Sequence, residues 1–167
     1  MQVRVAIPSD APFVATVQVD AWRAAYRGLM PERVLEALDA AAKVASWEGF
    51  IASENDGVFA AELGAHLIGF VHVCPSRDAD ADAVGEVGSM YVAPAYWRQR
   101  VGTALLREAE RWCLSRGFSA VTLWVLEANG AARGFYERFG YSPDGASKRP
   151  PKSGLLEVRY RRSPVGR

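Results

Sequence analysis

The residues best suited to chemistry lie where a hydrophobic run gives way to a helical pattern, in the stretch YVAPAYWRQRVGTALL from Tyr91 to Leu106. Arg98 and Arg100 precede Gly102 at the point where the helical pattern begins. The first turn of a helix leaves backbone N–H groups unpaired and carries the positive end of the helix dipole. A glycine there lets an anion approach the backbone without a Cβ in the way. The stretch therefore predicts an anion site.

Neither of the two common phosphate-binding signatures occurs in the chain. The Walker pattern G-x-x-x-x-G-K-[ST] is absent, and no G-x-G-x-x-G follows the first expected strand. A phosphate-binding nucleotide domain is therefore the least favoured of the interpretations considered.

Length and composition restrict the class of protein. The chain has 167 residues, of which 50% are hydrophobic and 23% charged, and its net charge is +1. This profile is typical of one globular domain, expected over residues 1–162, with a loose tail at 163–167. A general nucleic-acid binder usually carries a basic surplus, so we expect no nucleic-acid partner. No apolar segment is long enough for a signal peptide or a membrane span, so we expect a cytoplasmic protein without a membrane partner.

Metal-ligating residue types are few and widely spaced. Cys74 and Cys113 are the only cysteines, and His66 and His72 are the only histidines. Their spacing matches no zinc motif and no disulfide framework, so we expect no metal. The acidic segment PSRDADADA is predicted to be a solvated, mobile loop. Cation binding is its weaker alternative, because it lacks the glycine and terminal glutamate of a calcium loop.

Hydrophobic periodicity predicts alternating strands and helices that would position these residues. Strands are expected at 3–7, 58–63, 67–74, 85–92, 118–126 and 155–162, with a further short strand possible within 141–154. Helices are expected at 11–26, from 31, through 44–51, at 103–116 and at 129–139. The early hairpin favours antiparallel pairing, and the later strand–helix–strand order favours parallel pairing. Both fit an α/β fold of mixed α+β type, with helices on both faces of a mixed sheet.

Ordered segments of the chain resemble the GNAT superfamily, the acyl-CoA-dependent N-acetyltransferases. SMYVAP and VGTALL resemble the strand end and helix start around the family's Gln/Arg-x-x-Gly-x-Gly/Ala loop, and LEANGAARGFYERFGY resembles its later strand–Asn–helix segment. AWRAAYRGLMP and the C-terminal PDGASKRP and LLEVRYRR are similar to stretches of bacterial members. Gln99 to Ala104 fits the loop literally. We favour a second register, in which Arg100 stands at the first glycine and keeps its backbone role if its φ is negative.

The resemblance implies a fold, a co-substrate and partners. The fold would be a single domain with a mixed central sheet of six to seven strands and about four helices, in which the fourth and fifth strands splay apart to admit CoA. Acetyl-CoA would be the co-substrate, a small-molecule amine or a peptide the acceptor, and a homodimer is possible. The implied CoA-binding residues are Met90, Tyr91, Val92, Arg98, Gln99, Arg100, Val101, Gly102, Thr103 and Asn129.

The resemblance also implies two catalytic residues. Tyr136 follows Asn129 by seven residues, which matches the family spacing, and would protonate the departing thiolate. Its alternative role is packing against neighbouring phenylalanines. Glu86 is the candidate base, directly or through water, and period two would place it on one strand face with Gly88 and Met90. Its alternative is an edge glutamate that faces solvent.

The acceptor side is less well defined by the sequence. Trp22 and Tyr26 lie where family members place the acceptor-binding wall, but they are four residues apart on an expected helix, so ordinary packing explains them equally well. Two functions remain open. One is an N-acetyltransferase in which a primary amine attacks acetyl-CoA directly in a ternary complex, and the other is a non-catalytic acyl-CoA-binding sensor or regulatory module.

Overall fold

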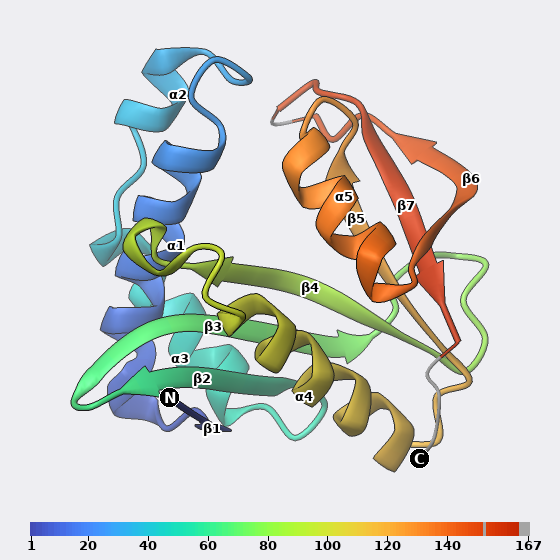
Figure 1. Cartoon of the computed structure of the whole chain (residues 1–167), viewed down its shortest axis with the longest axis horizontal. Coiled ribbons are helices and arrows are strands. Elements are labelled where there is room, and N and C mark those ends of the chain that lie inside the picture. Colours follow the sequence, from blue (N-terminus) through green and yellow to red (C-terminus); the bar gives the residue numbers. More distant parts are fainter. Residues whose placement is uncertain (152, 164–167) are drawn as a thin grey trace.

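The computed structural model describes residues 1–151 and 153–163, so 164–167 of the expected tail lie outside the described residues. The described strands form one seven-stranded sheet in the order β1-β2-β3-β4-β5-β7-β6 (Figure 1). All neighbouring strands pair antiparallel except β4 and β5, which are parallel. The expected α/β fold with a mixed sheet is therefore confirmed. The strands are β1 Gln2–Val5, β2 Gly57–Leu63, β3 His66–Pro75, β4 Val84–Val92, β5 Ala120–Leu126, β6 Ser142–Lys148 and β7 Glu157–Arg162.

Helices cover both faces of the sheet. One face carries α1 and α3, whose apolar residues pack with Phe70 of β3, and the other carries α4 and α5 (Figure 1). The expected apolar stripe of α4 is buried as predicted, through Leu105, Leu106, Ala109 and Cys113. The bounds are α1 Ala11–Ala25, α2 Glu32–Glu36, α3 Val44–Ala52, α4 Val101–Ser115 and α5 Gly130–Phe139. None of the described helices combines the length and the apolar character that a membrane crossing requires.

One expected element differs from what the structure shows, and one that the sequence left open is present. The helix expected from residue 31 is only the five-residue α2, in which Leu35 is the one fully buried side chain. The connection expected within 141–154 contains a seven-residue strand, β6, which pairs with β7 at the edge of the sheet. Its sequence SPDGASK has no apolar alternation, so only the pairing with β7 makes it a strand.

The parallel strands β4 and β5 separate before they end. Their pairing runs from Val84 opposite Ala120 to Val87 opposite Leu123. Beyond these positions β4 continues to Val92 and β5 to Leu126, but the two strands no longer pair with each other. Figure 1 shows them diverging. The expected splay of the fourth and fifth strands is therefore confirmed.

The two glycines of β4 have different roles, one at a close approach and one at a bulge. A Cβ on Gly85 would lie 2.4 Å from Cys113 Sγ, so this glycine lets α4 approach the strand. The register with β3 shifts so that His72 pairs with Ser89 and Val73 with Val87, which leaves Gly88 as the extra residue of a β-bulge. The bulge lies at the point where β4 leaves β5.

Candidate functional site

The N-terminus of α4 presents backbone donors next to the opening between β4 and β5. The first helical bond runs from Ala104 N–H to the Arg100 carbonyl at 3.1 Å. The N–H groups of Val101, Gly102 and Thr103 donate to no other described residue, and no described side chain caps the helix. These three donors, together with the helix dipole, form a site suited to an anion.

The condition set for the backbone role of Arg100, a negative φ, is not met. Its φ is +64°, and Arg98 has a φ of +62°, so both arginines adopt the left-handed conformation that glycine takes without strain. The favoured register, which places Arg100 at a glycine position of the family, agrees with this backbone. The strain at these two non-glycine positions, on either side of Gln99, is of the kind that accumulates at ligand-binding loops.

Gly102 has a different neighbour from the one expected. A Cβ at this position would lie 3.4 Å from Phe135 Cζ and 3.9 Å from Met90 Cε. The space left by the missing side chain therefore faces α5 and β4 rather than the approach of an anion. Its N–H remains among the three donors of the first helical turn.

Side chains of the loop hold the end of β4 and the entrance to α4. Trp97 Nε1 donates to the Val92 carbonyl at 2.7 Å, and Gln99 Nε2 donates to the Ala95 carbonyl at 3.0 Å. Ala93 N–H bonds to Ile68 of β3, so by strand alternation the backbone of Tyr91 also faces β3. The polar backbone groups of Met90 and Val92 consequently point toward the opening, whereas those of Tyr91 do not.

Aromatic side chains from both faces of the sheet meet at the opening. Tyr26 of α1 and Tyr136 of α5 lie close enough that Tyr26 helps to raise the pKa of Tyr136, and both interact with the Tyr91 phenol. The rings of Trp22 and Tyr26 make an edge contact at 5.0 Å, and Trp22 lies 6.3 Å from Tyr91. Trp22 Nε1 is buried and has no hydrogen-bond partner among the described residues. The structure therefore brings together Trp22, Tyr26 and Tyr136, as a shared site requires.

Tyr136 also packs, as its alternative role predicted. Its ring lies 5.3 Å from Phe135 and 6.1 Å from Tyr141. Burial is the main cause that raises its pKa, and Tyr26 adds to the effect. The phenol therefore keeps its proton well above neutral pH. At neutral pH it can donate a hydrogen bond but does not lose the proton.

Glu86 is buried, which contradicts the alternative of an edge glutamate facing solvent. It accepts a hydrogen bond from the Arg77 guanidinium at 2.5 Å and another from Arg77 N–H at 3.2 Å. It shares a strand face with Gly88 but not with Met90, which packs in the core under α4. The bulge at Gly88 shifts the alternation by one residue, so the expected common face of Glu86 and Met90 is wrong.

Asn129 caps α5. Its side-chain oxygen accepts a hydrogen bond from Ala132 N–H at 3.1 Å, the geometry of a helix N-cap. The capping role that the sequence allowed is confirmed. A contact with the co-substrate remains a prediction.

His72 has polar neighbours that the sequence spacing did not indicate. Its Nε2 lies 2.6 Å from Asp56 Oδ1, and the ligand atoms of Asp56, His72 and Cys74 all lie within 4.8 Å of one another. Burial lowers the pKa of His72, against the effect of Asp56, and raises the pKa of Cys74 to about 12. The imidazole of His72 and the thiol of Cys74 therefore stay mostly uncharged. That the protein binds no metal remains a prediction.

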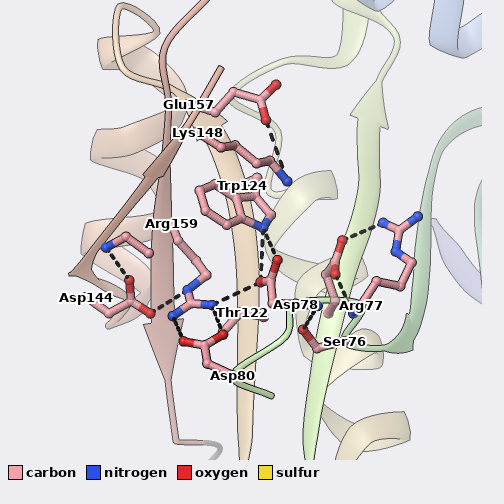
Figure 2. Close-up of polar contacts among 12 residues, drawn as sticks. Ser76, Arg77, Asp78, Asp80, Thr122, Trp124, Asp144, Lys148, Glu157 and Arg159 are labelled. Atoms are coloured by element: carbon pink, nitrogen blue, oxygen red, sulfur yellow. Dashed lines mark hydrogen bonds and ion pairs between the residues drawn. The ribbon is translucent and has the colours of Figure 1, made fainter. Parts of the chain in front are cut away.

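The acidic loop between β3 and β4 is exposed at Ala79, Asp80, Asp82 and Ala83, as expected of a solvated loop, but it also bonds to the sheet. Its mobility remains a prediction. Arg159 of β7 is buried and binds Asp78 at 3.1 Å, Asp80 at 2.7 Å and Asp144 at 2.7 Å (Figure 2). Asp78 in turn accepts hydrogen bonds from Trp124 Nε1 at 3.1 and 3.3 Å. An internal arginine, rather than a bound cation, pairs with these carboxylates.

The comparisons with known proteins agree with this geometry. The model of the acetyltransferase (GNAT) family matches residues 19–141. The chain belongs to the GNAT family. It is 33% identical over 144 residues to the uncharacterized N-acetyltransferase YuaI of Bacillus subtilis, covering 85% of this chain and 79% of that protein. It is 30% identical over 148 residues to the probable N-acetyltransferase Rv2775 of Mycobacterium tuberculosis, covering 87% and 82%.

Solved structures show the same GNAT fold. The PaiA N-acetyltransferase of Thermoplasma acidophilum, solved in complex with coenzyme A, superposes with a TM-score of 0.80 at 19% identity and covers 97% of this chain and 98% of that chain. At this identity the likeness concerns the fold. The expected membership of the superfamily is confirmed by the family match and by the two relatives.

Proposed function

We propose that the domain spanning residues 1–162 transfers the acetyl group of acetyl-CoA to a primary amine of a small molecule or a peptide N-terminus. The observation that carries the proposal is the opening between β4 and β5. Free N–H donors of α4 lie at one side of it, and the phenols of Tyr26 and Tyr136 meet within it. Such an opening fits a long ligand with a diphosphate at one end and a reactive thioester at the other.

Main-chain groups would bind most of the co-substrate. The diphosphate would accept hydrogen bonds from Val101, Gly102 and Thr103, each charge-assisted bond contributing about 1.5–3 kcal/mol. Arg98 and Arg100 would add charge from the same loop. The pantetheine arm would bond to the backbone of Met90 and Val92 in the manner of an added strand. Asn129, which caps α5, would hydrogen-bond the pantetheine amide.

The reaction would be a direct attack in a ternary complex. The neutral amine forms a bond to the thioester carbonyl carbon, and the carbon–sulfur bond then breaks. The amine proton passes to Glu86 through water, and the leaving thiolate accepts a hydrogen bond from the Tyr136 phenol. Because burial raises the pKa of Tyr136, full proton transfer to the thiolate is uphill, so donation of a hydrogen bond is its expected contribution.

Glu86 must lose part of its ion pair to act as a base. The Arg77 side chain is 67% exposed whereas that of Glu86 is 5% exposed, so the arginine can move into solvent while the carboxylate stays in place. The variant Glu86→Gln keeps the shape of the side chain and removes the base. We expect it to abolish the acidic limb of the profile of kcat against pH. A variant that keeps the wild-type limb would remove Glu86 from the mechanism.

The decisive experiment measures CoA binding and thiol release on the same protein. Titration calorimetry should show binding of coenzyme A, and free thiol should appear when acetyl-CoA is mixed with an accepted amine from a panel. Binding without thiol release from any amine would favour the non-catalytic sensor. No heat at millimolar coenzyme A would overturn the binding site and every role built on it.

A further inference from the structure

Three side chains from neighbouring strands meet on the face of the sheet opposite α4 and α5. They are Trp124 of β5, Glu157 of β7 and Lys148 of β6 (Figure 2). The strand neighbours of Trp124 and Glu157, including Leu123 and Val158, pack into the core under α4 and α5, so alternation turns Trp124 and Glu157 to the other face. That is the face on which α1 and Glu86 also lie.

The three side chains form a cation-binding arrangement that is already filled from within the chain. The Lys148 ammonium lies 3.9 Å from the centroid of the Trp124 ring and 3.9 Å from Glu157 Oε2. An ammonium over an indole face beside a carboxylate is a favourable geometry for an amine cation. Lys148 ends an edge strand and its side chain is 43% exposed, so it can leave for solvent.

The aromatic wall of this arrangement is fixed in place. Trp124 Nε1 donates to both oxygens of Asp78, and Asp78 is held by Arg159, whose side chain is only 8% exposed. The carboxylate wall is half-buried, and burial raises the pKa of Glu157 while Lys148 lowers it. At 3.9 Å the ion pair of Glu157 with Lys148 is too long for a hydrogen bond, so no hydrogen bond between the two side chains holds the ammonium in place.

The arrangement borders the opening between β4 and β5. Trp124 is the first residue of β5 after Leu123, the last residue that pairs with β4. Glu157 pairs with Leu126 at the end of β5, and it lies near enough to Tyr26 to raise the pKa of that phenol. A molecule bound between Trp124 and Glu157 would therefore lie beside the phenols of the opening.

We propose that Trp124 and Glu157 form an acceptor subsite for a second ammonium group, which Lys148 occupies until the acceptor displaces it. The substrate class is then a small linear diamine or polyamine, whose free end reaches the thioester while the other end sits over Trp124. This inference rests on the proposed function, because it assigns the acceptor of the same site.

The test compares putrescine with butylamine, which has the same chain length and lacks the second amine. For the wild-type protein with saturating acetyl-CoA, we expect the KM of putrescine to be about five- to tenfold lower than that of butylamine. This is the gain that one cation–π contact with Trp124, next to the Glu157 carboxylate, predicts. Glu157→Gln should raise the KM of putrescine and leave that of butylamine unchanged. Lys148→Met should lower the KM of putrescine, because the internal competitor is gone. Lys43→Met makes the same change of charge away from β5, β6 and β7 and serves as the control.

Binding is measured separately from turnover, so that the two proposals can fail independently. Putrescine and butylamine are titrated into the CoA-loaded protein and its variants by calorimetry. Absence of thiol release with every amine counts against the transferase, whereas the binding titration still decides the subsite. Equal affinity of the wild-type protein for the two amines, or weaker putrescine binding after Lys148→Met, would overturn the subsite even in an active enzyme.

Discussion

At the scale of single residues, the opening between β4 and β5 is a place where polar groups are kept from water. The phenols of Tyr26, Tyr91 and Tyr136 approach one another there from opposite faces of the sheet, and burial raises the pKa of each. A phenol in such surroundings holds its proton and offers it as a hydrogen bond. In the proposed mechanism such a phenol would stabilise the thiolate by a hydrogen bond rather than give up its proton.

The variant Tyr136→Phe tests this role. We expect kcat with saturating acetyl-CoA to fall about 10²-fold, the lower end of what general-acid assistance supplies, while the affinity for coenzyme A stays unchanged. Because the pKa of Tyr136 lies above its ordinary value of 10.0, its ionisation should produce no fall in wild-type kcat below pH 10. A descending limb at lower pH that the phenylalanine variant abolishes would contradict the raised pKa.

Arg100 supports the second prediction at this scale. Its φ of +64° costs a residue with a side chain about 1–2 kcal/mol and costs glycine almost nothing. Arg100→Gly and Arg100→Ala both remove the guanidinium, so they differ only in this backbone preference. We expect the glycine variant to be more stable by about 1 kcal/mol in urea unfolding, part of the relief being offset by glycine's entropy in the unfolded chain. It should also bind coenzyme A more tightly, and equal stability of the two variants would show that the left-handed turn is not retained.

At the scale of elements, α4 and β4 set the geometry of the opening together. The helix packs its buried side chains onto the sheet, and its N-terminus ends beside the strand segment that has left β5. Gly85 permits this packing, because any Cβ there would overlap Cys113. The position of the donor groups of α4 therefore depends on a glycine at the far end of β4.

Gly85→Ala should be strongly destabilising for this reason. A Cβ 2.4 Å from Cys113 Sγ forces the helix or the strand to shift, and overpacking of this kind costs about 1–3 kcal/mol. Gly49→Ala is the matched control, because Gly49 lies within α3 with no atom within 4 Å of the added Cβ. The control should gain up to about 1 kcal/mol from helix propensity. Chemical unfolding measures both, and a Gly85→Ala protein as stable as the wild type would contradict the close approach.

The sequence predicted well those elements in which the spacing of apolar residues shows by itself which face is buried. The stripe through Leu105, Leu106 and Cys113 predicted α4 because a helix shows its apolar side within its own residues. The effect of the bulge at Gly88 could not be read from the period of the strand. The bulge reverses the side of β4 on which Met90 lies relative to Glu86, and only the pairing with β3 fixes that reversal.

At the scale of the whole molecule, the parts of the site that escaped the sequence are those assembled from distant segments. The donor turn at Val101 to Thr103 could be predicted because it is local. The group of Trp124, Lys148 and Glu157 could not, since it needs the strand order β5-β7-β6 to bring three strands together. The ion pairs of the acidic loop could not be predicted for the same reason, because its partner Arg159 lies on β7 at the other side of the sheet's opening.

Arg159 is the residue on which this long-range assembly most depends, and its removal gives the last prediction. It joins the β3–β4 loop, through Asp78 and Asp80, to β7 and to Asp144. In Arg159→Met, Asp78 and Asp144, whose side chains are 19% and 16% exposed, lose a buried partner. We expect the free energy of unfolding at pH 7 to fall by about 2 kcal/mol, less than for a fully buried pair because both carboxylates keep some solvent.

The ion pair of Arg159 with Asp80 determines how the stability difference between wild type and Arg159→Met changes with pH. Arg159 lowers the pKa of Asp80 from 3.8 to about 2, so the stabilisation is fully present above pH 3.8 and is lost as pH falls through about 2. The difference in stability between wild type and Arg159→Met should therefore be largest near neutral pH and shrink in acid. Urea unfolding at pH 7 and at about pH 3 measures it, with Arg107→Met, an exposed arginine of α4, as the control. A difference that grows in acid would contradict the assignment, because protonation of Asp80 removes its ion pair with Arg159 and leaves less stabilisation for the substitution to remove.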